Sequence, residues 1–186
     1  MKEILINPIG KIRIQGEEVF IKLDKKYVPA LNELDDFSHL NVFWWADGFD
    51  NPELRSILET PKPYKSGPDV IGIFATRSPI RPNPIALTTV QILNIDHENG
   101  IIKIPYIDAN DNSPVIDLKP YTPSVDRVEN PSVPKWCSHW PKSVENQENL
   151  IGKMKLNFKL LFLDFINSFS TFILFTLTNI LCHICI

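Results

Sequence analysis

A proline-rich segment at residues 73–87 constrains the fold of this chain more than any other feature of its sequence. It reads IFATRSPIRPNPIAL and places Pro79, Pro82 and Pro84 close together. Each proline fixes its own φ and biases the preceding residue toward extended geometry, so a helix cannot form there. The sequence therefore predicts a stiff loop that presents Arg77 and Arg81.

The whole chain is rich in proline and poor in glycine. Its 186 residues include 16 prolines, all before residue 142, and 7 glycines. No two glycines stand in a G-x-G arrangement, which excludes the usual dinucleotide-binding fingerprint and the P-loop. Charged residues make up 22% of the chain and hydrophobic residues 44%, so a wholly disordered or collagen-like protein is excluded as well.

The chain changes character near residue 150, and we divide it into a body, residues 1–149, and an apolar tail, residues 150–186. Three interpretations of the tail stay open: a membrane anchor flanked by lysines, a packed helix of the domain, and an incidental extension. The pair Cys182 and Cys185 lacks the further ligands that a zinc site needs, so we expect no metal. The N-terminus does not read as a signal peptide, and we expect a cytoplasmic protein.

The body is expected to be mainly β, because short apolar or β-branched runs follow one another along it. Asn51 and Pro52 predict a short helix that runs to Leu58, with asparagine as the N-cap. Many short strands with one or two short helices favour a compact β-barrel over a Rossmann sheet, which needs long helices. The predicted strands are residues 4–6, 12–14, 19–23, 40–45, 70–75, 87–95, 101–104 and 115–118.

The net charge of the body gives no bulk attraction to nucleic acid. The body holds 16 Lys and Arg against 21 Asp and Glu, and 16 − 21 = −5. Phosphate contacts supply much of the affinity of proteins for RNA, so RNA binding would need a local positive patch. Scattered solvated lysines are the alternative. The candidates for such a patch are Lys62, Lys65, Arg77, Arg81, Lys103 and Lys119.

The side chains of the proline-rich loop suit an anion or a heterocycle. A guanidinium on a stiff loop can bind a carboxylate or a phosphate through two hydrogen bonds. Because the loop is already ordered, binding loses little conformational entropy. Asn83 adds an amide that can read the edge of a heterocycle. A surface turn with two solvated arginines is the alternative interpretation of the same residues.

A second polar segment, residues 106–121, reads YIDANDNSPVIDLKPY. Its Asp, Asn, Ser and Pro residues are good turn formers, and a strand follows them. Asp117 and Lys119 share one face of that strand, so an ordinary ion pair is the alternative to a site.

Together, FATRSPIRPNPIALT at residues 74–88 and NSPVIDLKPYTPSVD at residues 112–126 resemble the paired signatures of the TrmO/TsaA-like methyltransferases. FSH at residues 37–39 resembles a further element of that family. The resemblance implies a small β-barrel that acts as a homodimer and uses S-adenosylmethionine. The implied reaction is methylation of N6 of a threonylcarbamoyl-modified adenosine beside the anticodon, so the implied partner is the anticodon loop of tRNA.

The resemblance also implies where the cofactor and the substrate bind. Arg77 stands at the place of the family's cofactor-binding arginine, Leu87 at a backbone contact to the cofactor, and Asp47 with Gly48 at a further cofactor contact. The second cofactor-binding stretch corresponds to Pro105, Tyr106, Ile107 and Asp108. The signature residues without an assigned role, which we take as pocket candidates, are Arg81, Asn83, Asp117, Lys119 and Tyr121.

Several departures mark a divergent subgroup of this family. The N-terminal PRQ element is absent, Ala86 replaces a signature glycine, and Asn112 with Ser113 replaces Gly-Thr. The acceptor therefore stays open between the modified tRNA adenosine and another small molecule or nucleotide, and a ligand-binding barrel without catalysis is the third reading.

The chemistry of methyl transfer suggests further candidates. The sulfonium cation of the cofactor favours carboxylates and aromatic faces, which Asp47, Asp108, Trp44, Trp45 and Tyr106 offer. A carbamoylated adenosine N6–H is acidic enough for a modest base, and Asp108 is the candidate for that role. Cofactor binding or turn capping is the alternative role of Asp108.

Overall fold

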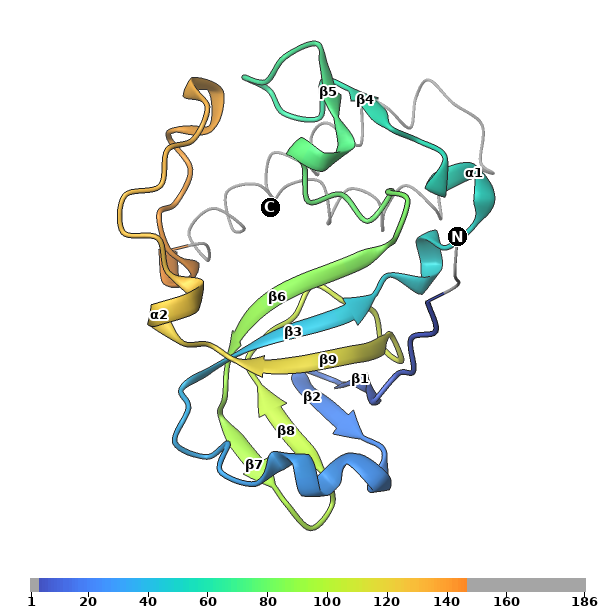
Figure 1. The fold of residues 1–186 in the computed structure, drawn as a ribbon, viewed down its shortest axis with the longest axis vertical. Helices are drawn as coiled ribbons and strands as arrows, with labels where there is room; N and C mark the ends of the chain where they lie inside the picture. The colour runs from blue at the N-terminus through green and yellow to red at the C-terminus, as the bar shows by residue number, and fades with distance from the viewer. Residues whose placement is uncertain (1–3, 147–186) are drawn as a thin grey trace. The chain divides into compact units, whose positions relative to one another are not determined.

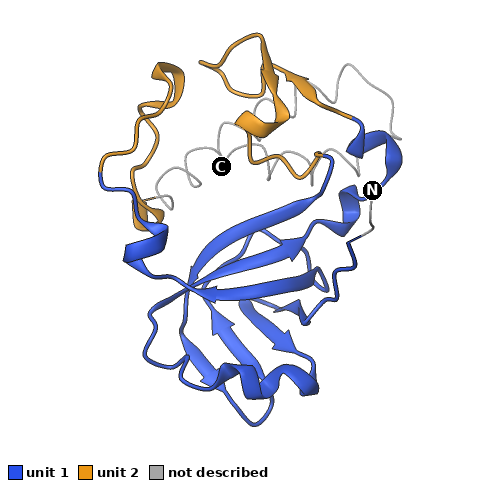
Figure 2. Cartoon of the chain, in the orientation of Figure 1, with its two compact units in different colours: residues 1–56, 82–129 blue, residues 57–81, 130–186 orange. Residues whose placement is uncertain are grey.

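A computed structural model describes residues 4–146 of the chain (Figure 1). Within this range the chain forms two compact units, which we consider separately: unit 1 holds residues 4–56 and 82–129, and unit 2 holds residues 57–81 and 130–146 (Figure 2). The predicted boundary between body and tail, the three readings of the tail, and the pair Cys182 and Cys185 all lie outside the described residues.

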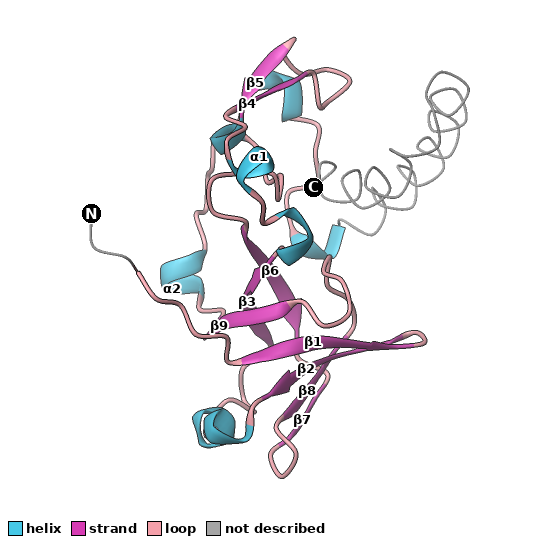
Figure 3. Ribbon diagram, turned by 90° about the vertical axis from the view of Figure 1, so that its right-hand side faces the viewer, coloured by secondary structure: helices cyan, strands magenta, loops and turns pink. Residues whose placement is uncertain are grey.

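Unit 1 is built on one sheet of seven antiparallel strands in the order β6-β3-β9-β1-β2-β8-β7. Its helices are few and short beside the strands (Figure 3). The prediction of a mainly β protein is therefore confirmed. The strands are β1 (Gly10–Gln15), β2 (Glu18–Leu23), β3 (His39–Trp45), β6 (Ile85–Gln91), β7 (Asn94–Asp96), β8 (Ile101–Ile104) and β9 (Pro114–Pro120).

Short helical segments connect these strands at several points. As predicted, Asn51 caps α1 (Pro52–Arg55): its side-chain oxygen accepts a hydrogen bond from the backbone N–H of Leu54 at 2.9 Å, and Pro52 opens the helix. The helix ends at Arg55, earlier than expected. The other helical segments of unit 1 are α2 (Pro123–Asp126) and the 3₁₀ turns Lys25–Leu31 and Asp47–Phe49.

The predicted closed barrel is not found among the described residues. Strands β6 and β7 form the two edges of the sheet and do not pair with each other. They follow one another along the chain instead (Figure 1). Between them, the N–H of Ile92 donates to Ser38 beside β3 and the N–H of Leu93 donates to Lys103 in β8. The segment from β6 to β7 thus pairs first with β3 and then with β8. The two ends of the sheet are connected by this continuous segment and not by hydrogen bonds between β6 and β7.

The core of unit 1 lies on one side of β3. Leu40, Val42 and Trp44 are at most 2% exposed, as are Ile12 of β1 and Val115 of β9. Side chains alternate along a strand, so the residues between them, such as Phe43 and Asn41, belong to the opposite side. That second side carries several of the predicted site residues.

Three predicted strands differ from the structure, and one of them, 87–95, is divided between β6 and β7. Ile4 and Leu5 are 88% and 84% exposed and form no strand; backbone pairing with β9 starts at Ile9, after Pro8, which has no N–H to donate. The predicted strand 70–75 is correct only in its first part, because β5 (Val70–Gly72) ends at Gly72. The hydroxyl of Thr76 donates to the carbonyl of Ile73 at 2.8 Å, which stabilises a 3₁₀ turn there.

Unit 2 contains a two-stranded sheet of β4 (Glu59–Pro61) and β5 (Val70–Gly72), with 3₁₀ turns at Ile73–Ala75, Lys135–Cys137 and Val144–Asn146. Three aromatic rings join its two segments. Tyr64 stacks on Trp136 at a centroid distance of 5.1 Å, and Trp140 packs edge-on against both rings at 5.0 and 5.5 Å. No helix in residues 4–146 has the length and apolar character of a bilayer span.

Gly10 is needed where β1 passes between β2 and β9. A Cβ built there would lie 2.3 Å from the carbonyl oxygen of Lys22 and 2.8 Å from Cα of Leu23. We predict that Gly10→Ala lowers the free energy of unfolding by about 1–3 kcal/mol, because the rigid backbone of β2 must shift. Thermal denaturation measures the change.

Gly72→Ala is the matched control, since a Cβ at Gly72 would meet nothing within 4 Å. Equal melting temperatures for the two variants would contradict the steric argument.

Candidate functional site

The register of three neighbouring strands brings the two signatures together. Phe43 of β3 lies opposite Leu87 of β6 and opposite Asp117 of β9, and one step along β3, Asn41 lies opposite Thr89 and Lys119. Directly opposed residues of antiparallel strands point to the same side. We call this side, formed by Asn41, Phe43, Leu87, Thr89, Asp117 and Lys119, the three-strand face.

Asp117 and Lys119 form the ion pair that was expected as the alternative to a site. Their Nζ and Oδ2 atoms are 3.0 Å apart, and the backbone N–H of Leu118 donates to Asp117 Oδ1 at 3.0 Å. Both side chains are at least half exposed. Such a surface pair contributes roughly 0–1 kcal/mol, so a charged ligand could exchange for it at little cost.

Asn41 is a buried polar residue of the three-strand face that the sequence did not single out. Its amide nitrogen donates to Asp126 Oδ1 at 2.9 Å, and its amide oxygen accepts from Thr89 Oγ1 at 2.7 Å. Asp126 also accepts from the N–H of Thr122 at 2.7 Å. These bonds fasten α2, which follows the second signature, to the centre of the three-strand face.

Tyr121 lies beside the FSH element. Its backbone N–H donates to the carbonyl of His39 at 2.9 Å, and the rings of His39 and Tyr121 make an edge contact at 6.4 Å. Ser38 Oγ lies 2.9 Å from His39 Nδ1. The structure thus brings Tyr121 to one end of the three-strand face.

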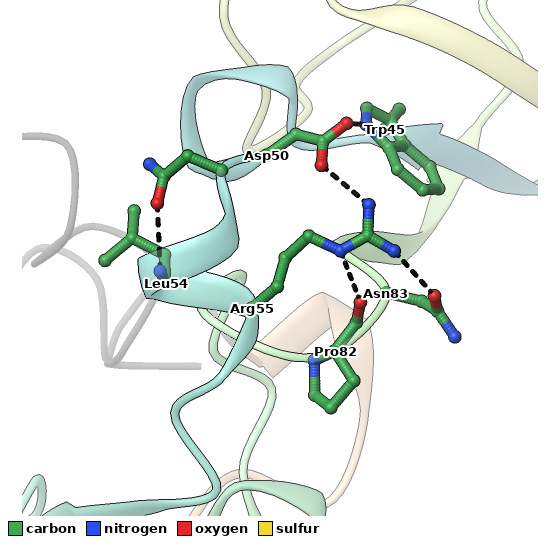
Figure 4. Close-up of polar contacts among 7 residues, drawn as sticks. Trp45, Asp50, Leu54, Arg55, Pro82 and Asn83 are labelled. Carbon is green, nitrogen blue, oxygen red and sulfur yellow. Dashed lines mark hydrogen bonds and ion pairs between the residues drawn. The ribbon is translucent and has the colours of Figure 1, made fainter.

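Arg55 is a second residue that the sequence did not single out, and it holds the proline-rich loop (Figure 4). Its Nε donates to the carbonyl of Pro82 at 2.8 Å, Nη1 to Asp50 Oδ1 at 2.8 Å, and Nη2 to Asn83 Oδ1 at 3.2 Å. Asp50 in turn accepts from the indole N–H of Trp45 at 3.0 Å. The helix cap at Asn51 is the local signal that places Arg55 here.

The backbone carbonyls of residues 82–84 all accept hydrogen bonds. Pro82 accepts from Arg55, Asn83 accepts from the N–H of Ile85 at 2.7 Å, and Pro84 accepts from the N–H of Ala46 at 2.9 Å. Prolines donate no backbone hydrogen bond, so these accepted bonds fix the loop where it enters β6. These three hydrogen bonds, together with the prolines, explain why residues 82–84 are held rigidly.

Arg77 and Arg81 belong to unit 2, whereas the other predicted site residues belong to unit 1. The turn between the arginines is held by side-chain hydroxyls: Thr76 Oγ1 accepts from the N–H of Ser78, and Ser78 Oγ accepts from the N–H of Ile80, both at 3.2 Å. Ser78 is buried, while Arg77 is on the exposed side of the turn.

The remaining cofactor candidates lie on two loops of unit 1. Asp47 and Gly48 are exposed in the 3₁₀ turn after β3. After β8, Tyr106 is 43% exposed and its hydroxyl lies 3.5 Å from Asp108 Oδ1, while Pro105 is exposed beside it. Ile107, between Tyr106 and Asp108, is buried.

Of the two tryptophans considered for the cofactor, one is excluded. Trp44 is 2% exposed on the core side, where its indole N–H donates to Thr88 Oγ1 at 3.1 Å. Trp45 lies half-buried at the end of β3, on the same side as the three-strand face. The exposed Tyr106 and the partly buried Asp108 supply the aromatic ring and the carboxylate that suit a sulfonium cation, so the donor set fits such a cofactor.

The turn of the second signature is tied to β1 by a carboxylate. Asp111 Oδ1 accepts from the backbone N–H of Ile14 at 2.9 Å and lies 3.2 Å from Arg13 Nε. The hydrogen bond from Ile14 and the nearby positive charge of Arg13 hold the pKa of Asp111 below its ordinary value. The tie therefore stabilises the turn at neutral pH and is lost as the pH falls through that lowered pKa.

No cluster of three or more His, Cys, Asp or Glu side chains suited to a metal ion occurs in residues 4–146. The polar groups gathered in unit 1 are amides, carboxylates and a guanidinium, together with exposed aromatic rings. Such a set can bind an organic ligand that carries a cation and hydrogen-bonding edges.

Comparison with known proteins places these features in a family. Residues 5–127 match the family described as tRNA-methyltransferase O N-terminal domain. An S-adenosyl-L-methionine-binding protein of Archaeoglobus fulgidus is 36% identical over 108 residues, which cover 58% of this chain and 72% of that protein. The tRNA (adenine(37)-N6)-methyltransferase of Escherichia coli is 29% identical over 126 residues, which cover 66% of this chain and 52% of the enzyme.

The fold is similar to the crystal structure of TrmO from Pseudomonas aeruginosa, with a TM-score of 0.54 and 24% identity over 70% of this chain and 61% of that one. This chain thus spans about half the length of the Escherichia coli enzyme and three fifths of the Pseudomonas protein. The resemblance first seen in the two signatures is confirmed. Because the match covers more than half of its residues, this chain belongs to the tRNA-methyltransferase O N-terminal domain family.

Proposed function

We propose that this protein transfers a methyl group from S-adenosylmethionine to N6 of an adenosine in tRNA, and that the acceptor is the threonylcarbamoyl-modified adenosine next to the anticodon. The family match over residues 5–127 carries the proposal. The names of the relatives, an S-adenosyl-L-methionine-binding protein and a tRNA (adenine(37)-N6)-methyltransferase, support its cofactor and its reaction.

S-adenosylmethionine supplies an electrophilic methyl group on a positively charged sulfur. The adenosine N6 forms the new C–N bond as the C–S bond breaks, the sulfur leaves with its electron pair, and N6 loses one proton. The protein's part in such a displacement is mainly positioning. In this proposal Tyr106 and Asp47 lie against the cofactor, and Asp108 accepts the N6 proton.

The distribution of charge supports an RNA substrate despite the negative body. Residues 57–81 and 130–146 of unit 2 carry six Lys and Arg and three Asp and Glu, so 6 − 3 = +3. Residues 4–56 and 82–129 of unit 1 carry nine against sixteen, so 9 − 16 = −7. The positive charge that phosphates require is therefore concentrated in one unit.

The aromatic rings of unit 2 bring two of its basic segments together. Tyr64 precedes Lys65, and Trp136 follows Lys135, so the stacking of the two rings holds these lysines on neighbouring segments. Both lysines are exposed. A pair of lysines held in this way suits the sugar–phosphate backbone of an anticodon stem or loop.

A homodimer in the cytoplasm is part of the proposal. Strand β6 is an edge of the sheet, and its Ile85 and Leu87 are each 37% exposed. An edge strand with apolar side chains offers both hydrogen-bonding groups and apolar area to a second copy. Sedimentation of the purified protein as a monomer at micromolar concentration would count against this part.

Calorimetric titration with S-adenosylmethionine tests the cofactor. We expect micromolar binding by the wild-type protein, and we expect Arg77→Ala to weaken it by about 1–3 kcal/mol if the guanidinium makes a charge-assisted contact. Arg127→Ala, which removes the same charge from an exposed position after α2, should leave the affinity unchanged. An absence of binding by the wild-type protein would refute the enzyme proposal.

Nucleoside mass spectrometry tests the acceptor. Deletion of the gene should remove the N6-methylated threonylcarbamoyladenosine from the anticodon loops of the host, and purified protein with S-adenosylmethionine should restore it. Unchanged levels in the deletion strain, with methylation of a different nucleotide or a small molecule by the purified protein, would redirect the function to that substrate.

The lysines of unit 2 give a separate prediction for RNA binding. Lys65→Gln combined with Lys135→Gln should weaken tRNA binding and lower the slope of log K against log salt by about 1–2, since each phosphate contact contributes about 0.7–0.9. The control pair is Lys11→Gln with Lys25→Gln, two exposed lysines of unit 1. Equal slopes for the two double variants would exclude the aromatic-held lysines from the RNA interface.

A further inference from the structure

Asn83 presents one particular end of its side-chain amide to solvent. A guanidinium has five N–H donors and no acceptor, so the amide oxygen of Asn83, and not its nitrogen, must face Arg55. The 3.2 Å contact between Nη2 and Oδ1 has this arrangement. The amide nitrogen then points away from Arg55 (Figure 4).

The guanidinium that sets this orientation is itself fixed. Its Nε and Nη1 are bound at 2.8 Å by the carbonyl of Pro82 and by the carboxylate of Asp50, which is held in turn by the indole of Trp45. Rotating the Asn83 amide by half a turn would bring its N–H groups against the N–H groups of Arg55. The orientation is therefore set by contacts made before any ligand arrives.

The loop is also held by contacts that do not involve the Asn83 side chain. The carbonyls of Pro82, Asn83 and Pro84 are engaged by Arg55, Ile85 and Ala46, and the two prolines restrict the backbone on either side. Asn83 is exposed, while Pro84 next to it is buried. An exposed amide with a fixed donor end on a rigid loop is arranged for a hydrogen bond to a ligand rather than for stability.

We propose that the Asn83 amide nitrogen is a hydrogen-bond donor site for an acceptor atom of the ligand, a carbonyl, carboxylate or ring nitrogen, and that Arg55 is the positioning residue that sets its polarity. This inference rests on the proposed function, under which two ligands carry such acceptors. One is the cofactor, with its carboxylate and adenine nitrogens, and the other is the modified adenosine of the tRNA.

Asn83→Asp separates a ligand contact from a structural role. The carboxylate keeps an oxygen toward Arg55, now as an ion pair, and places a second oxygen where the N–H donor stood. We expect an unchanged or higher melting temperature and a fall of at least tenfold in kcat/KM for tRNA methylation, because two acceptors then face each other. Asn94→Asp, which adds the same charge to an exposed position of β7, is the control and should keep full activity.

The two sources of the acceptor are distinguished by the affected constant. A weaker affinity for S-adenosylmethionine in calorimetry assigns the acceptor to the cofactor, whereas an unchanged cofactor affinity with a raised KM for tRNA assigns it to the RNA. Wild-type kcat/KM and affinities in Asn83→Asp would overturn the inference.

A double variant of Arg55 and Asn83 tests whether Arg55 acts by positioning Asn83. If Arg55 acts through Asn83, Arg55→Ala lowers the same constant, and Arg55→Ala combined with Asn83→Asp is no worse than the more impaired single variant. Independent, multiplying losses would assign Arg55 a separate role and overturn its assignment as the positioning residue. A wild-type protein that neither binds S-adenosylmethionine nor methylates tRNA overturns the proposed function and this inference together, whereas an active wild type with a fully active Asn83→Asp overturns the inference alone.

Discussion

The geometry of the proline-rich loop depends on the guanidinium of Arg55. Prolines make a chain stiff, but they cannot fasten it, because they have no N–H to donate. The loop must therefore be held through its carbonyls, and Arg55 and the N–H of Ala46 do this on either side of Asn83. A short helix with a single capping residue suffices to place Arg55, since α1 has only four residues and begins at a proline.

Strand register gives the candidate site its second constraint. In the sequence, residues 89–111 separate the two signatures, and in the sheet β3 lies between their strands. Because opposed residues on adjoining strands point to the same side, alternate positions of both signatures meet on the three-strand face while the intervening positions form the core. A shift of one residue in either pairing would turn Leu87 or Asp117 inward. The part-buried hydrogen bond between Asn41 and Thr89 supports the register of β3 and β6, and the bond from Asn41 to Asp126 fastens α2 beside it.

How far the sequence could predict this structure depends on where the relevant signal lies. Local signals were sufficient for β2, β3 and β8 and for the cap at Asn51, where apolar pattern and residue type agree with the final fold. They failed at residues 73–75, where the Thr76 side chain stabilises a 3₁₀ turn, and at residues 4–6, because an apolar run forms a strand only where a partner strand is available. The open sheet was missed since partner exchange at Ile92 and Leu93 is not a local property.

The site shows the same limit. The signatures contain Asn83 and Asp117, but nothing in their composition indicates Arg55 or Asn41, whose roles arise from contacts with residues 28 and 85 positions away. An arginine at the end of a four-residue helix looks like a solvated charge in the sequence. The local signal near Arg55 is the N-cap at Asn51. A four-residue helix is too short to be stable by itself, so a capped helix of this length points to a role for the residues on it, such as Arg55.

The opposite charges of the two units suit the two ligands of the proposed reaction. The cofactor of that reaction is a cation at its reactive sulfur, and the acidic unit 1, at −7, provides the carboxylates of the exposed Asp47 and the partly buried Asp108. The RNA is a polyanion, and the basic unit 2, at +3, provides exposed lysines on segments joined by stacked aromatic rings. A uniformly basic protein would attract RNA while repelling the sulfonium, so a separation of the charges is what the proposed reaction requires. The negative net charge that first argued against an RNA substrate is thus the consequence of a larger acidic unit, and the arginine turn of the first signature belongs to the basic one.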